Sequence, residues 1–173
     1  MLRCAVPDRP GALAALAGAI GEVGGDIQAV DVVETGGEVA LDDLVVVLHD
    51  DTPLSALLDS VRSVDGVELI HAGPSRGHPG DAVSRLMLGI ESMLNGAMDV
   101  SHGVQALIGG LLRAVSVELV DPAKAPRRDA KTLVLPFGAL AIVAIRDYRF
   151  TDTERTRAEE ILRTGLEVAR HLR

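Results

Sequence analysis

The segment Val6-Pro7-Asp8-Arg9-Pro10-Gly11-Ala12-Leu13 decides the fold, because it takes the chain from a strand into a helix within a few residues. The residues before it, Leu2–Val6, are strand formers, and the following prolines and Gly11 require a turn. Pro10 fits the first helical position, where its missing N–H would have no partner in any case. The helix is expected to end at Gly24-Gly25. Its apolar residues recur at helical spacing: Leu13, Leu16, Ile20 and Val23.

Four further elements are predicted before residue 73. Two strands, Ile27–Thr35 and Val39–His49, are joined by a tight turn at Gly36-Gly37. Asp51-Thr52-Pro53 predicts the start of a second helix, with a capping side chain just before the proline, and Val67–Ala72 is the last strand. The order βαββαβ predicts an α+β fold, a ferredoxin-like sheet with both helices on one face.

These residues also resemble the signature of ACT domains. That family has Asp or Asn, any residue, Pro, Gly, any residue and Leu after the first strand, and Asn-Ile at the start of the second. Asp8–Leu13 resembles the first part and Gly24–Ile27 the second, with Asp26 in place of the usual Asn. The resemblance covers residues 2–73 and implies an ACT regulatory domain at residues 1–73.

The resemblance also implies a function, because ACT domains typically bind an amino acid or a similar metabolite at a dimer interface. They pass the signal to an attached domain. We therefore expect a non-catalytic regulatory protein that forms a homodimer and changes its subunit arrangement when an amino acid or related small metabolite binds.

The residues of this signature are the candidate ligand site. Gly11 has no side chain, so a carboxylate can approach the unpaired N–H groups at the positive end of the helix. Asp8 and Asp26 are expected on either side of this helix mouth, placed to receive an ammonium group. An alternative stays open: Asp8 only caps the helix, Asp26 only solvates a turn, and the module is only a dimer interface. The candidate ligand-binding residues are Asp8, Arg9, Pro10, Gly11, Ala12, Leu13, Asp26, Ile27 and Gln28.

Charge is divided unevenly along the 173 residues. Residues 1–73 carry three basic and thirteen acidic residues, a net charge of −10, whereas residues 74–173 carry +2. An acidic first half repels phosphate backbones and anionic lipids, and aromatic residues make up only 2%, so few rings can stack on bases. We therefore expect no nucleic-acid and no membrane partner. The N-terminus lacks a signal pattern, which indicates a cytoplasmic protein.

A linker is predicted at residues 74–80, where Pro and Gly interrupt both periodicities. Asp81 can cap the helix that follows. A second apolar helix, roughly Val104–Ala114, contains Gly109-Gly110, where another backbone can pack closely. Three strands follow, the last two paired as a hairpin around Gly138: Val115–Val120, Thr132–Leu135 and Ala139–Arg146.

The final helix is predicted to begin at Thr151 with a capping box completed by Glu154. Gly138–Ile142 and Arg149–Glu154 resemble the end of a GAF domain, a family that commonly finishes with a glycine-led strand, an aromatic-Thr/Ser-x-x-Glu helix start and a long amphipathic helix. This resemblance covers residues 81–173 and implies a small GAF-like α+β domain with about three strands. We expect it to dimerise through its helices, because it shows no cyclic-nucleotide signature.

No pattern for catalysis or metal binding emerges. The five histidines show no metal-ligand spacing with each other or with Cys4, the only cysteine, and no phosphate loop exists. The pairs Asp42-Asp43 and Asp50-Asp51 are interpreted as solvated turns. We expect no catalytic residue, no metal and no cofactor. Two other function classes stay open, namely a scaffold that uses both domains only for dimerisation and for binding a protein partner, and an enzyme.

Overall fold

The computed structural model describes residues 1–49, 51–75 and 82–172. The chain divides into two compact units, Met1–Pro79 and Gly80–Arg173. Each unit has its own sheet and its own hydrophobic core. Asp50 and the predicted cap Asp81 lie outside the described residues.

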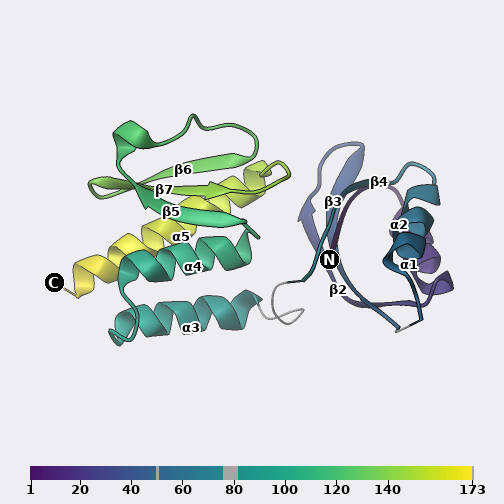
Figure 1. Ribbon diagram of the computed structural model, residues 1–173, viewed down its shortest axis with the longest axis horizontal. Helices are drawn as coiled ribbons and strands as arrows, with labels where there is room; N and C mark the ends of the chain where they lie inside the picture. The colour runs from purple at the N-terminus through teal and green to yellow at the C-terminus, as the bar shows by residue number, and fades with distance from the viewer. Residues whose placement is uncertain (50, 76–81, 173) are drawn as a thin grey trace. The chain divides into compact units, whose positions relative to one another are not determined.

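The first unit is an antiparallel sheet covered by two helices on one face (Figure 1). The strand order is β2-β3-β1-β4, so the sequence order βαββαβ and the predicted ferredoxin-like sheet are confirmed. The elements are β1 (Leu2–Pro7), α1 (Ala12–Glu22), β2 (Gly25–Glu34), β3 (Val39–Leu48), α2 (Leu54–Ser63) and β4 (Glu68–Ala72).

The core of this unit lies between the sheet and the two helices. Side chains alternate along a strand, so Leu2, Cys4 and Val6 of β1 all point to the helix-bearing face. They pack there with side chains from β3, α1 and α2: Leu44, Leu16, Ile20, Leu57 and Val61. The apolar periodicity read from the sequence is therefore the one that is buried.

Both helices of the first unit begin differently from the prediction. α1 starts at Ala12, after Gly11, whose φ of 88° is left-handed, so Pro10 lies before the helix rather than in its first position. α2 begins after Pro53 and receives no hydrogen bond from a capping side chain, so the expected cap by Asp51 or Thr52 is wrong. The predicted end of α1 at Gly24-Gly25 is confirmed, since the helix ends at Glu22 and Gly24 has positive φ.

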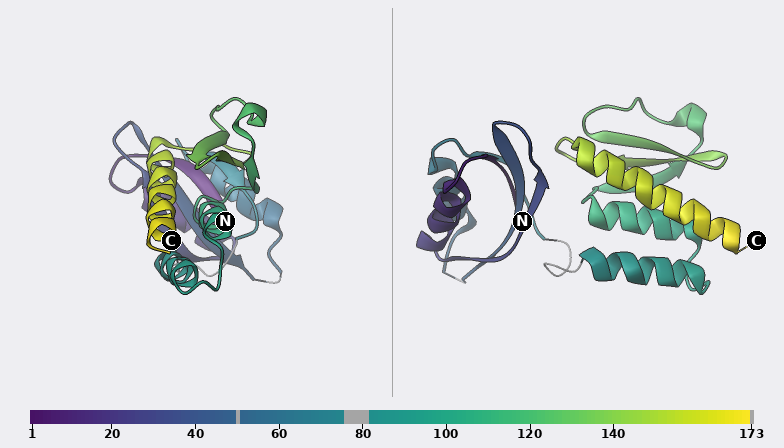
Figure 2. Two further views of the ribbon diagram at one scale, coloured as in Figure 1. Left: turned by 90° about the vertical axis from the view of Figure 1, so that its left-hand side faces the viewer. Right: turned by 180° about the vertical axis from the view of Figure 1, so that it is seen from behind.

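The second unit is a three-stranded antiparallel sheet with helices packed on one face (Figure 2). The strand order is β5-β7-β6, so the predicted β6–β7 hairpin is confirmed, while β5 and β6 both pair with β7. The second helix begins at Val100, four residues before the predicted start, because Asp99 caps it through the N–H of Ser101. The elements are α3 (Ala82–Leu94), α4 (Val100–Leu111), β5 (Ser116–Val120), a 3₁₀ turn η1 (Pro122–Lys124), β6 (Thr132–Phe137), β7 (Leu140–Ile145) and α5 (Asp152–His171).

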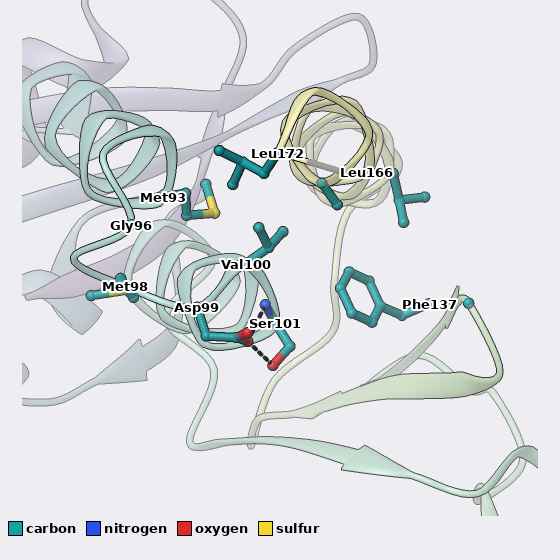
Figure 3. A pocket seen from close by; sticks show the side chains of 11 residues that line it. Met93, Gly96, Met98, Asp99, Val100, Ser101, Phe137, Leu166 and Leu172 are labelled. Atoms are coloured by element: carbon teal, nitrogen blue, oxygen red, sulfur yellow. Dashed lines mark hydrogen bonds between the residues drawn. The ribbon is translucent and has the colours of Figure 1, made fainter.

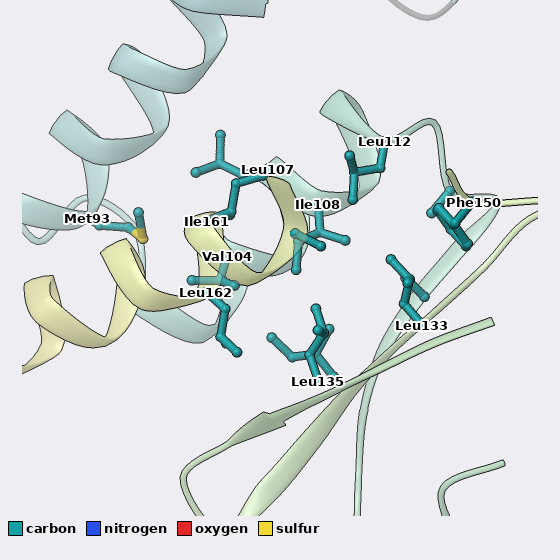
Figure 4. Packing of buried hydrophobic residues seen from close by; sticks show 14 of the residues in the cluster. Met93, Val104, Leu107, Ile108, Leu112, Leu133, Leu135, Phe150, Ile161 and Leu162 are labelled. Carbon is teal, nitrogen blue, oxygen red and sulfur yellow. The ribbon is translucent and has the colours of Figure 1, made fainter. Parts of the chain in front are cut away.

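Small residues let the helices of this unit approach closely, though not where the sequence indicated. A Cβ at Gly165 of α5 would overlap the Val104 side chain of α4, and one at Gly103 would overlap Met93 of α3. At Gly109 a Cβ would meet only Val117 at an ordinary 3.4 Å, and at Gly110 it would meet nothing. The prediction of close packing at Gly109-Gly110 is therefore wrong. Figure 4 shows part of the hydrophobic core of the unit, in which Phe150 packs with aliphatic side chains.

A buried ion pair joins β7 to the start of α5. Arg146 (1% exposed) donates Nη1 to Glu154 Oε1 at 2.8 Å and to the Leu112 carbonyl at 2.7 Å. Its guanidinium also stacks on the rings of Tyr148 and Phe150, at 4.2 and 3.9 Å. Glu154 and Thr151 form a capping box at the start of α5, so the capping box predicted from the sequence is confirmed. One carboxylate thus neutralises a buried cation and caps the longest helix.

Helix α3 is apolar on a face that the unit itself leaves exposed. Val83, Met87 and Leu94 are 72, 63 and 51% exposed, while Met93 of the same helix is fully buried.

Among the described residues, no helix combines the length and apolar character that crossing a membrane requires.

Candidate functional site

The turn between β1 and α1 leaves the start of the helix open. Gly11 occupies the N-cap position without a side chain to cap the helix, and a Cβ there would meet no atom within 4 Å. The N–H of Ala12 bonds to the Arg9 carbonyl and that of Ala15 to the Gly11 carbonyl. The amides between them, on Leu13 and Ala14, have no acceptor in the described part of the chain.

These free amides form the positive end of α1. No acidic residue stands in the first turn of the helix to neutralise it. Unpaired N–H groups and the helix dipole together favour an anion such as a carboxylate. The geometry expected for Gly11 is therefore present, although the residue stands outside the helix rather than within it.

The predicted ligand residues fall into two groups. Residues 8–11 form the exposed turn, followed in α1 by the half-buried Ala12 and by Leu13. Asp26 and Gln28 are exposed on β2, with Ile27 half-buried between them. Gln28 donates its Nε2–H to Asp26 Oδ2, so one oxygen of that carboxylate already accepts a hydrogen bond.

The two groups lie at opposite ends of the sheet. Pro7, just before Asp8, pairs with Val39 of β3, whereas Asp26 pairs with Val47. Eight residues of β3 separate these two levels, which at the rise of an antiparallel strand is about 27 Å. This distance exceeds the length of any amino acid. The expectation that Asp8 and Asp26 flank one helix mouth is therefore wrong within a single chain.

Sequence reasoning missed a buried carboxylate on the helix-bearing face of the sheet. Asp42 lies on β3 opposite Cys4 and is only 3% exposed, so the interpretation of Asp42-Asp43 as a solvated turn is wrong. Because Cys4 faces the helices, Asp42 faces them too, beside Leu44 of the core. Its Oδ1 is buried and has no hydrogen-bond partner in the described part of the chain.

The neighbouring Asp43 points to the other face and is neutralised. It pairs with Arg3, whose Nε donates to Asp43 Oδ1 at 2.7 Å and whose Nη2 donates to Oδ2 at 2.9 Å. No arginine or lysine is paired with Asp42 among the described residues, and its pKa is raised. The largest cause is burial, and the negative charges of Asp43 and Asp8 contribute less. Burial, with Asp42 and Asp43, also raises the pKa of Cys4 to about 12.

The second unit contains a groove of about 630 Å³ between the start of α4, the β6–β7 turn and the end of α5 (Figure 3). Its polar rim is Asp99, which accepts hydrogen bonds from the amide and hydroxyl of Ser101, and these bonds lower the pKa of Asp99. Asp99 is also the cap of α4, so a structural role accounts for its position. The remaining lining is mostly apolar and includes Met93, Met98, Val100, Phe137, Leu166 and Leu172.

Across the described ranges of the chain, no cluster of three or more His, Cys, Asp or Glu side chains is arranged to hold a metal ion.

Comparison with known proteins concerns mainly the first unit. Residues 1–66 match the family model of the ACT domain, which supports the resemblance stated above for this part of the chain. No curated protein matches the chain. The resemblance of residues 81–173 to GAF domains stays a prediction.

Two solved structures are similar over most of their length, but only weakly. One is the regulatory subunit of aspartate kinase from Thermus thermophilus in its ligand-free form, with 11% identity and a TM-score of 0.34, covering 96% of this chain and 91% of that one. The other is an unknown protein from Galdieria sulphuraria, with 13% identity and a TM-score of 0.34, covering 99% of this chain and 91% of that one. Both TM-scores are too low to show a shared fold.

Proposed function

We propose that this chain is a regulatory protein whose first unit binds an amino acid or related metabolite at the mouth of α1. The observation that carries the proposal is the open helix start behind Gly11, within the part that matches the ACT domain. The free amides of Leu13 and Ala14 would receive the ligand's carboxylate. The signal is a shift in the population of subunit arrangements.

A homodimer belongs to this proposal. Asp26, at the far end of the sheet from the mouth of α1, can contact the same ligand only from a second copy of the chain. The GAF-like role proposed for the second unit is also dimerisation, supported by the exposed apolar side chains of α3. Analytical ultracentrifugation with and without ligand measures the subunit arrangement directly.

The binding step is tested by thermal unfolding in the presence of each of the twenty amino acids at millimolar concentration. A ligand that binds only the folded protein raises the melting temperature by mass action. Gly11→Val should abolish the rise, because a branched side chain blocks the mouth of the helix. Its matched control is Gly138→Val, since Gly138 also has positive φ (61°) and open space around it, but lies in the second unit.

The control also separates two locations. Gly138 lines the groove of the second unit, so loss of the thermal shift in Gly138→Val but not in Gly11→Val would move the ligand to that groove. Absence of a shift with every amino acid would favour the alternative, a scaffold that uses both units only for dimerisation and for binding a protein partner.

A further inference from the structure

The loop between β5 and β6, residues 121–131 (the basic loop), carries exposed positive charges that have no acidic partner. Its cations lie within eight residues, and all of them are exposed: Lys124, Arg127, Arg128 and Lys131. None of them forms an ion pair with any residue that the structure describes. Exposed arginines elsewhere in the chain are paired with carboxylates: Arg9, Arg62, Arg163 and Arg170. The basic loop therefore differs from the rest of the charged surface in offering its cations to solvent.

The two acidic residues of the basic loop bind its own backbone. Asp121 Oδ1 accepts the Ala123 N–H at 2.8 Å and caps the turn η1. Asp129 Oδ1 accepts the Lys131 N–H at 2.8 Å. Four basic and two acidic residues give the loop a net charge of +2, and because the whole chain carries −8, the rest of it carries −10. The loop is thus a local positive surface on a strongly acidic protein.

The basic loop is also held in place by the start of α5. Arg155 donates Nη2 to the carbonyls of Asp129 and Ala130, at 2.8 and 3.2 Å. The Ala130 carbonyl also accepts the Phe150 N–H at 2.7 Å, and two prolines within the loop restrict its backbone. In Figures 1 and 2 the loop lies on the opposite side of the second unit from α3. A segment that is ordered before it binds loses less conformational freedom on binding, so this loop is suited to recognition.

We propose that the basic loop is a docking surface for a short acidic segment of a partner protein. Surface charges act over about 8 Å at physiological ionic strength, so a short acidic segment is attracted by the loop alone. DNA or an anionic membrane extends beyond the loop and is repelled by the rest of the chain, with its charge of −10. The proposal goes beyond the function proposed above, because it does not involve the mouth of α1. It gives the regulatory chain a surface through which a second protein receives its signal.

The test measures binding of a fluorescein-labelled peptide of twelve glutamates to the full chain, by fluorescence anisotropy at low ionic strength. The variant is Arg127→Gln with Arg128→Gln. Its control is Arg163→Gln with Arg170→Gln, which changes the net charge equally but removes arginines already paired with glutamates on α5. Peptide affinity should fall about 3- to 30-fold in the loop variant, the size of two exposed ion pairs, and less than about 2-fold in the control.

Two further measurements separate the acidic segment from other polyanions and from unfolding. A labelled DNA duplex of twelve base pairs should bind more weakly than the peptide, and thermal unfolding checks that both variants are folded. Equal loss of peptide affinity in the variant and the control would overturn the proposal, since only net charge would then matter. Absence of peptide binding to the wild type, or tighter binding of DNA than of peptide, would overturn it as well. No amino acid is present in these measurements, so each outcome leaves the proposed ligand site intact.

Discussion

Replacing Glu154 by Gln should destabilise the second unit by about 3–5 kcal/mol, because it leaves the guanidinium of Arg146 buried without a counter-charge. Gln can still accept the Thr151 N–H, so the capping box is kept and the loss comes from the charge. With a urea m-value of about 1.5 kcal/mol/M, the unfolding midpoint falls by about 2–3 M.

The chain offers a specific assay for this loss. Tyr148 is the only tyrosine, no tryptophan is present, and its ring is buried against Arg146, so tyrosine fluorescence in urea reports on the second unit. Glu160→Gln is the matched control, since Glu160 pairs with Arg163 on the exposed face of α5 at 3.6 Å and should cost less than 1 kcal/mol. A Glu154→Gln midpoint within experimental error of the control would refute the reasoning.

Gly165→Ala should cost about 1–3 kcal/mol by overpacking against α4, whereas Gly110→Ala, with open space at its Cβ, should be neutral or slightly stabilising in the same fluorescence assay. Folding raises the pKa of Asp42. The free energy of unfolding of the first unit therefore falls as the pH rises from the usual carboxyl pKa through the pKa of the folded state, because the ionised carboxylate is buried. Asp42→Asn should therefore be more stable than wild type at neutral pH and equal to it near pH 3, measured by urea-dependent labelling of Cys4. Cys4 itself, fully buried and with a pKa of about 12, should resist thiol reagents at pH 8 until urea opens the first unit; fast labelling of the native chain would contradict this.

The fold of the first unit could be predicted because each local pattern agreed with the next. The start of α1 could not be predicted exactly. Pro10 is a residue type that favours the first helical position, but Gly11 adopts a left-handed φ, so the helix begins only after Gly11. The start of α2 failed for a related reason, since Asp51 and Thr52 have capping chemistry but do not cap.

The candidate site was predictable only in part. The signature located the mouth of α1, but the joint placement of Asp8 and Asp26 ignored strand direction. β1 and β2 both run antiparallel to β3, so the end of one and the start of the other must lie at opposite ends of the sheet. The predicted topology contained this information. The burial of Asp42 could not be predicted from the sequence, because two adjacent aspartates are typical of a solvated segment. Only the pairing of β1 with β3 shows that Arg3 binds Asp43 and that Asp42 lies opposite Cys4.

The strand order of the second unit has a consequence for synthesis of the protein. All partners in the first sheet have been made once Ala72 is added, so that unit can fold while the rest is being translated. Among the strands that the structure describes, β5 and β6 of the second unit pair only with β7, which follows both of them in the sequence. The nascent chain must therefore carry α3, α4 and two unpaired strands until residues 140–145 emerge, and this interval is when it is most exposed to chaperones and aggregation.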